Sequence, residues 1–248
     1  MLRKRVITVL TFNDGILFRT KTFIPDYRYT VNFVDAWSID EIVLLDVTRP
    51  ERRDPELFSS VVAKFSKNCF VPMCVGGGVR DLDDVKRYLD LGADKVAINT
   101  QAIEQPELIT KAAKRFGSQC VVVSIDVRKE SSGVYRVYKN CGRHPTQWQP
   151  EELAQRVEGL GAGEILLTAV EKDGSLEGYD NKLNADVVKS VKIPVIVCGG
   201  AGKWKDFADG FMVAGADAVA TTNVYHFTET SIKSAKQYLS RRGLNVRS

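Results

Sequence analysis

The sequence predicts a single (β/α)8 TIM barrel, and three observations lead to this fold class. Short apolar runs typical of buried strands alternate with amphipathic helical patterns along the whole chain, as in parallel βαβ units. The motifs of the first half return in the same order in the second half. The length of 248 residues, with 44% apolar residues, suits one eight-stranded barrel with a well-buried core.

The predicted elements can be followed in order along the chain. The strands lie near 5–10, 41–46, 71–75, 94–98, 120–126, 163–168, 194–198 and 217–221. Between them, the clearest helical patterns cover 81–92, 106–116 and 150–160. We expect these units to close into one domain over residues 1–248.

The two halves are related by a nearly constant offset. Glu41 corresponds to Glu164, Gly76-Gly77 to Gly199-Gly200, and Gly92-Ala93-Asp94 to Gly215-Ala216-Asp217, each 123 residues further on. At the first strand the offset is 115, because 6–11 aligns with 121–126. Since the matches fall at equivalent points of successive units, we interpret them as a half-barrel duplication, with halves of about 1–117 and 118–248.

Composition disfavours several classes of function. The net charge is +4 and the charged residues, 27% of the chain, are of mixed sign. The basic clusters at 3–5, 49–53 and 241–242 are short and lack interleaved aromatic residues, so we expect most of them to be solvated surface and not a nucleic-acid site. The first predicted strand begins within five residues of Met1, which leaves no room for a signal peptide. No apolar run approaches the ~20 residues of a membrane span.

Cysteine and histidine usage indicates a reduced, cytoplasmic protein without a metal. The five cysteines are odd in number, and three lie in or beside apolar strand runs, where a thiol behaves as a small hydrophobe. The two histidines, His144 and His226, are far apart and lack ligand spacing. We therefore expect no metal, no cofactor and no Cys/His nucleophile.

Glycines and polar residues follow the strands where a barrel places its site, at the C-terminal strand ends. Two matched sets occur there: Gly76-Gly77-Gly78 with Asn99-Thr100, and Gly199-Gly200 with Thr222-Asn223. Glycine lets an anion approach backbone N–H groups, and a helix N-terminus, a hydroxyl or an amide adds donors. The pattern predicts two phosphate sites on opposite sides of the mouth. The alternative, that the glycines only allow tight turns, stays open.

Asp126 ends an apolar run and is the best candidate for a general base in the mouth. It could instead cap a helix or hold a loop. Asp46 and Asp173 are weaker candidates, since each could simply orient a loop. The first half has Thr11 at the position equivalent to Asp126, which raises the question whether a two-acid site has lost one acid.

Motifs spread over essentially the whole chain resemble the cyclase subunit of imidazole glycerol phosphate synthase. They are KRVI at 4–7, Leu45-Asp46, VGGGV at 75–79, GADKVAINT at 92–100, FGSQ at 116–119, GAGEILLT at 161–168, Asp173-Gly174, GYD at 178–180, GGAGK at 199–203 and His226-Phe227.

The resemblance implies a barrel that takes ammonia from a glutaminase subunit docked on its bottom face. At the mouth, a small substrate with two phosphates is cleaved and cyclised. The resemblance implies a catalytic carboxylate at Asp126. Phosphate or substrate contacts are implied at Arg19, Asp46, Gly78, Asn99, Thr100, Asp173, Gly174, Gly200, Thr222 and Asn223.

Four charged residues, Arg5, Glu41, Lys95 and Glu164, stand at the starts of predicted strands 1, 2, 4 and 6. Two positive and two negative groups at one level could close the barrel as an ion-pair ring. Spacing alone leaves a structural salt-bridge plug open. In the resembled family these positions form the gate of the ammonia passage, and Asp94 would then lie near the partner's docking surface.

The chain departs from the family's pattern at three places. The family's second catalytic carboxylate falls at Thr11, a loop lysine falls at Arg19, and the stretch 23–41 is shorter than usual. A threonine cannot shuttle a proton at neutral pH, and a positioned acid or base contributes roughly 10²–10⁴ in rate. Arginine is also a planar fork, whereas lysine is a point charge. Cyclase activity is therefore expected to be weakened or lost.

The leading hypothesis is a barrel like the glycosyl amidation-associated paralogues of surface-polysaccharide gene clusters. It would conduct ammonia to a separate sugar amidotransferase. The first alternative is an authentic cyclase, a lyase of histidine biosynthesis, with Asp46 or Asp173 as the missing acid. The second is a phosphosugar isomerase on the same fold, but that reaction also needs two acid/base groups and has no use for a gate.

Overall fold

The computed structural model confirms the predicted (β/α)8 barrel, and it describes residues 3–21, 24–26, 39–67, 69–222 and 232–247. Each strand pairs in parallel with the next, and the last pairs with the first, so the sheet closes on itself. The barrel strands are β1 (Arg5–Asn13), β4 (Glu41–Asp46), β5 (Met73–Gly76), β6 (Lys95–Ile98), β7 (Val121–Lys129), β10 (Glu164–Ala169), β11 (Val195–Cys198) and β12 (Ala218–Thr221).

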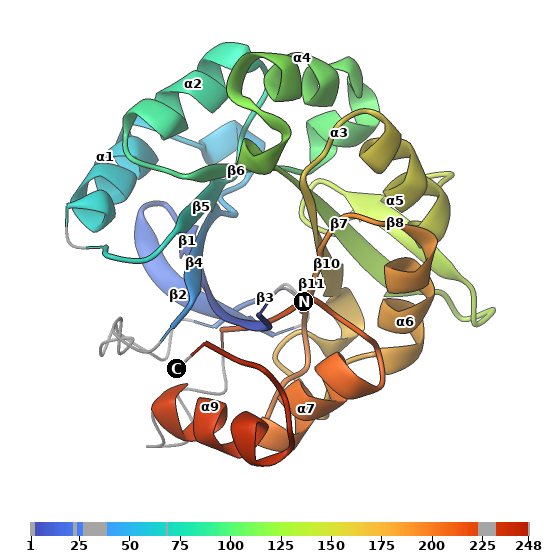
Figure 1. Cartoon of the computed structure of the whole chain (residues 1–248). Coiled ribbons are helices and arrows are strands. Elements are labelled where there is room, and N and C mark those ends of the chain that lie inside the picture. Colours follow the sequence, from blue (N-terminus) through green and yellow to red (C-terminus); the bar gives the residue numbers. More distant parts are fainter. Residues whose placement is uncertain (1–2, 22–23, 27–38, 68, 223–231, 248) are drawn as a thin grey trace.

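Helices form a ring outside these strands (Figure 1). They are α1 (Pro55–Ser66), α2 (Leu82–Asp90), α3 (Thr100–Glu104), α4 (Glu107–Phe116), α5 (Pro150–Gly159), α6 (Asn181–Ser190), α7 (Trp204–Met212) and α9 (Ile232–Arg241). The described residues also form three 3₁₀ helices, which are η1 (Pro50–Arg52), η2 (Ser118–Cys120) and η3 (Val170–Lys172). Aspartates begin several of the helices. Asp54 and Asp81, for example, accept hydrogen bonds from the first N–H groups of α1 and α2.

Strand side chains alternate between two separate apolar cores. In β1, Val6 and Leu10 belong to the large core that the helices cover, whereas Ile7 and Val9 belong to a smaller cluster formed only by strand residues. This period of two is the expected property of a strand. The barrel is therefore filled by side chains, and the polar residues at its two ends are separated by an apolar plug.

The strand register relates the two halves and places Thr11 where the sequence alignment put it. Thr11 pairs with Leu45, and Asp126 pairs with Thr168, the residue 123 positions after Leu45. One step of the predicted alignment is wrong. Leu45 pairs with Gly76, whereas its equivalent Thr168 pairs with Cys198, so Gly76 is equivalent to Cys198 and not to Gly199. The equivalent glycine pairs are therefore Gly77-Gly78 and Gly199-Gly200, and the offset between them is 122 residues.

Two antiparallel hairpins extend the mouth, and the sequence reading missed them. In the first half β1 continues into β2 (Ile16–Lys21) and β3 (Ile24–Asp26), and in the second half β7 continues into β8 (Tyr135–Lys139) and β9 (His144–Pro145). Asp14 and Gly15 both have positive φ, 51° and 71°, as a two-residue hairpin turn requires. Each hairpin follows the strand that carries Thr11 or Asp126.

One buried side chain predicts a stabilising substitution. Asn184 in α6 is fully buried, and neither atom of its amide has a hydrogen-bond partner among the described residues. Each unsatisfied buried polar group costs about 1–3 kcal/mol. Leucine branches at the same carbon, so we expect Asn184→Leu to raise the free energy of unfolding by about 1–3 kcal/mol in urea titrations. Asn184→Ala, which adds no apolar volume, is the control. A loss of stability for both variants would contradict the prediction.

Candidate functional site

A cavity of about 810 Å³ opens at the C-terminal ends of the barrel strands. It brings together most of the predicted mouth residues, namely Thr11, Asp46, Gly78, Asn99, Thr100, Asp126, Asp173 and Thr222. Gly174 and Gly200 are not among the residues that line it. The side chain of Arg19 and the whole of Asn223 lie outside the described residues.

Asp126 lines this cavity, and the pKa of its carboxyl is raised. Its side chain is buried, and this burial raises the pKa of the carboxyl from 3.8 to about 7, because the charged form loses water. The Asn99 amide donates to Asp126 Oδ2 at 3.2 Å and opposes the shift, whereas the charge of Asp173 adds to it. At neutral pH the group can therefore both give and take a proton.

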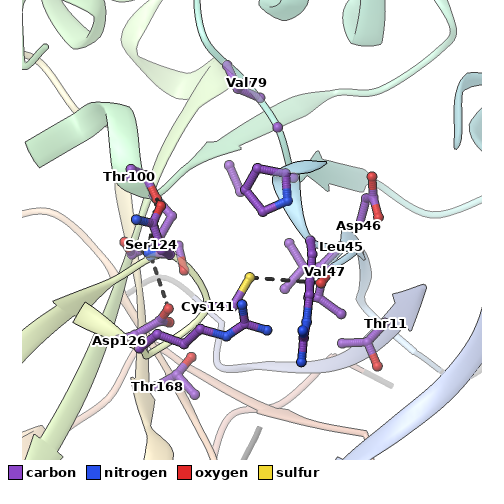
Figure 2. Close-up of a pocket in the computed structure, with 18 of the residues that line it drawn as sticks. Thr11, Leu45, Asp46, Val47, Val79, Thr100, Ser124, Asp126, Cys141 and Thr168 are labelled. Carbon is purple, nitrogen blue, oxygen red and sulfur yellow. Dashed lines mark hydrogen bonds between the residues drawn. The ribbon is translucent and has the colours of Figure 1, made fainter. Parts of the chain in front are cut away.

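Thr11 lies on the other side of the cavity from Asp126 (Figure 2). Both side chains are buried, and both are carried by strands that continue into hairpins. A threonine hydroxyl does not titrate near neutral pH, so the mouth has one ionisable group where its internal symmetry provides two positions. Asp173 also lines the cavity, and Asp46 is committed elsewhere.

Asp46 holds a buried arginine in place. Its Oδ1 accepts the Thr48 N–H at 2.9 Å, and its Oδ2 accepts Nε of Arg53 at 3.1 Å. Arg53 Nη2 also donates to the Thr48 carbonyl oxygen at 2.7 Å. Asp46 thus has the loop-orienting role that the sequence left open. The expectation that most of the basic clusters are solvated surface does not extend to Arg53, whose side chain is only 18% exposed.

The first glycine set forms a turn that only glycine fits. Gly77 has φ +107°, and a Cβ there would lie 2.2 Å from the Asp46 carbonyl oxygen. Gly78 has φ +69°, and a Cβ would lie 2.7 Å from Arg53 Cδ, so the arginine side chain packs directly on this turn. Asn99 and Thr100 follow at the start of α3. The Thr100 hydroxyl accepts the Asn140 N–H at 3.2 Å.

The second glycine set is more enclosed. Gly200 has φ +114°, and a Cβ there would lie 2.2 Å from the Gly178 carbonyl oxygen. Lys172 lies beside it, and its Nζ is 3.5 Å from the Glu177 carboxylate. Thr222 also lines the cavity, and it follows β12, the strand that pairs with β11 before this turn. The cations nearest the two turns therefore differ. Arg53 packs on the first turn and lines the cavity, whereas Lys172, beside the second turn, is paired with Glu177, and neither of these two residues lines the cavity.

At the opposite end of the barrel, the four predicted charges form a closed ring. Glu41 accepts Arg5 Nη1 at 2.8 Å and Lys95 Nζ at 2.9 Å. Glu164 accepts Arg5 Nη2 and the same Lys95 Nζ, each at 2.9 Å. Burial alone would lower the pKa of Lys95, but the two carboxylates more than reverse this and raise it, so Lys95 stays charged at neutral pH.

Asp94 lies at this same end, next to Lys95, but its carboxylate is already engaged. Its Oδ2 accepts the Met73 N–H at 2.8 Å. Phe70, in the segment that leads into β5, is 78% exposed and is the most exposed of the large apolar side chains that the structure describes. In the described part of the chain no cluster of three or more potential metal-ligating side chains occurs, and no described helix is long and apolar enough to cross a membrane. All five cysteines are unpaired.

The geometry defines a class of protein, a (β/α)8 barrel with a buried carboxylate at its mouth and a closed ion-pair ring at its floor. Residues 8–231 match the family described as "Histidine biosynthesis protein", and the chain belongs to this family. Three relatives are described as "Imidazole glycerol phosphate synthase subunit HisF". Those of Halalkalibacterium halodurans and Hydrogenobaculum are 41% and 40% identical over the full length of both chains. That of Dehalococcoides mccartyi is 41% identical over all of this chain and 99% of its own.

Proposed function

We propose that this chain is the barrel subunit of a glutamine-dependent synthase of the imidazole glycerol phosphate synthase type. It binds a small substrate with two phosphates at its mouth and receives ammonia through its floor from a glutaminase subunit. The observation that carries the proposal is the position of Asp126. It lies buried inside a large cavity, on a barrel whose other end is closed by the ion-pair ring.

The phosphate groups would bind at the two glycine turns. Gly77-Gly78 and Gly199-Gly200 occupy equivalent positions in the two halves, and both have backbone that only glycine adopts readily. Their N–H groups and the nearby Thr100 and Thr222 provide donors without a Cβ to block an anion. A substrate held at both ends would place its middle over Asp126.

The interior between floor and mouth suits neutral ammonia. Ile7 and Val9 on β1, and Cys74 and Ala97 on neighbouring strands, belong to the apolar cluster inside the barrel. Apolar surroundings favour NH3 over ammonium, because an unpaired charge is costly to bury there. Ammonia that passes the Arg5–Glu41–Lys95–Glu164 ring would therefore reach the mouth as a nucleophile.

The glutaminase would dock at the N-terminal end of the strands. Asp94 lies there next to Lys95 of the ring, and the exposed Phe70 precedes β5 at the same end. A large exposed aromatic side chain is a typical anchor of a protein interface. The relatives support this arrangement, since each is described as a subunit.

Two chemistries are candidates at the mouth. The relatives, similar over the whole chain, favour cyclisation and cleavage to imidazole glycerol phosphate, with Asp126 as acid and base. Thr11 favours the second candidate, in which cyclisation is lost and the barrel passes ammonia to a separate sugar-amidating enzyme of surface-polysaccharide synthesis.

Thr11→Asp separates these two candidates. If the chain passes ammonia on, the native protein should cyclise the substrate at least 10²-fold more slowly than the Thr11→Asp variant, because one positioned acid or base contributes roughly 10²–10⁴ in rate. The measurement is ammonium-dependent turnover of the phosphoribosyl substrate by both proteins. The control is Thr168→Ser. Thr168 is the residue of β10 that pairs with Asp126 of β7, and this substitution changes the site without adding an acid.

The outcomes point in different directions. Full activity of the native chain would establish the cyclase and remove the ammonia-passing candidate. Activity gained only with Thr11→Asp would support ammonia transfer on an intact mouth. Inactivity of both proteins, with phosphate still bound, would contradict the cyclase candidate and indicate a different substrate.

A further inference from the structure

The cavity at the mouth is strongly asymmetric in charge. Its arginines all come from the segments that follow β4 and β5 or from β7 and its hairpin, and they are Arg49, Arg52, Arg53, Arg80, Arg128 and Arg143. Among the described residues, the part of the cavity around the second glycine turn adds no lysine or arginine to the lining. Four acids also line the cavity, and one of them, Asp126, is partly neutral at pH 7.

Most of these arginines already have a protein partner. Arg53 is held by Asp46, Arg52 by Asp14, Arg80 by Asp84 and Arg128 by Glu171. In contrast, the guanidinium groups of Arg49 and Arg143 have no hydrogen bond or ion pair with any described residue, although both side chains line the cavity. Two cations that line a cavity without an ion-pair partner among the described residues favour an anionic ligand.

A contact between two loops brings these two arginines to the same part of the rim. Cys141 Sγ lies 3.9 Å from the carbonyl oxygen of Val47, which joins the hairpin after β7 to the loop after β4 (Figure 2). Arg143 follows Cys141 by two residues, and Arg49 follows Val47 by two residues. Arg53, on the same loop as Arg49, continues the positive surface down to Gly78, where its side chain packs on the turn.

We infer that the first glycine turn, together with Arg49, Arg53 and Arg143, forms a site for two adjacent anionic groups, such as a diphosphate. The second turn takes a single phosphate. The inference deepens the proposed function, because it rests on the glycine turns being phosphate sites. Planar guanidinium groups match the oxygens of phosphate in pairs, so two free arginines beside a cradle suit a second phosphoryl group. The substrate class would then be a diphosphate ester with a further phosphate or similar anion at its other end, which adds one anionic group to the two-phosphate substrate of the proposed function.

The test is calorimetric titration of the whole protein with inorganic phosphate and with inorganic pyrophosphate at one ionic strength. We expect pyrophosphate to bind at least tenfold more tightly than phosphate to the native protein. In the double variant Arg49→Gln/Arg143→Gln the ratio should fall to about three or less, with phosphate affinity changed less than about twofold. Arg143→Lys, which keeps the charge but removes the fork, should lose part of the preference. Both side chains are exposed, so folding should be unaffected.

Arg241→Gln removes the same charge from an exposed position on α9 and should leave both affinities unchanged. An unchanged ratio in the double variant would overturn the inference while leaving two phosphate sites in place. An equal loss of both affinities would also overturn it, because only the general field would then have changed. If the native protein bound neither ion, the proposed function itself would fail at the glycine turns.

Discussion

Replacing Glu41 with glutamine is expected to lower the free energy of unfolding by about 3 kcal/mol, the usual cost of removing one partner from a buried ion pair. The Glu41 side chain is only 2% exposed, and it accepts hydrogen bonds from both Arg5 and Lys95. Without its charge, two cations share the single carboxylate of Glu164, and the ring carries an uncompensated positive charge. Equilibrium unfolding in urea at pH 7.5 measures the loss.

The position of the charge in the ring should decide the size of the effect. Glu51→Gln, on the exposed η1 segment, removes the same charge and should change stability by less than about 0.5 kcal/mol. In the double variant Glu41→Leu/Lys95→Met one charge of each sign is removed and the Arg5–Glu164 pair remains, so much of the loss should be recovered. Equal stability of Glu41→Gln and the native protein would show that the ring is solvated and not a closed floor.

The Glu41→Gln substitution also tests the proposed ammonia passage. With a glutaminase partner present, glutamine-dependent turnover should fall relative to ammonium-dependent turnover, because a ring with unbalanced charge no longer admits only the neutral species. A structural plug would instead leave the ratio of the two rates unchanged. The ratio therefore tests the gate separately from the stability of the fold.

The barrel itself could be predicted from the sequence because its determinants are local. Apolar runs such as the one that leads into Asp126 specify strands, and the repeated glycines and charges specify the order of the units. The four floor charges were also predictable, since each stands at the start of its strand, directly before the apolar run. The one-residue shift at Gly77-Gly78 was not, because three consecutive glycines give no sequence signal for which two occupy the turn.

The hairpins and the arginine contacts show what the sequence reading missed. Asp14-Gly15 is a typical hairpin signal, and its position after β1 could have predicted β2. The role of Arg53 could not be read in the same way. Its burial depends on its hydrogen bonds to Asp46 and Thr48 and on its packing against Gly78, which are properties of the folded mouth and not of the basic cluster in which it stands. Similarly, only the Cys141–Val47 contact brings Arg143 beside Arg49.

Asp126→Asn should have opposite effects on stability and on chemistry. Burial raises the pKa of the native carboxyl to about 7, whereas the unfolded chain keeps a value near 3.8. Between these two values the folded state binds more protons than the unfolded state, so native stability falls as pH rises from about 4 to 7 and then stays constant. One pKa unit corresponds to about 1.4 kcal/mol, so the full penalty above pH 7 approaches about 4 kcal/mol.

Asparagine cannot ionise, and it can keep a hydrogen bond with Asn99, so the variant escapes this penalty. We expect it to be more stable than the native protein at pH 8.5, with the difference about 2–3 kcal/mol smaller at pH 5. Urea unfolding at the two pH values measures this change. Turnover should fall by 10²–10⁴, because the variant removes the lining carboxyl whose pKa lies near 7. A pH-independent difference in stability would mean that Asp126 is ionised throughout, and its role as both acid and base would then be untenable.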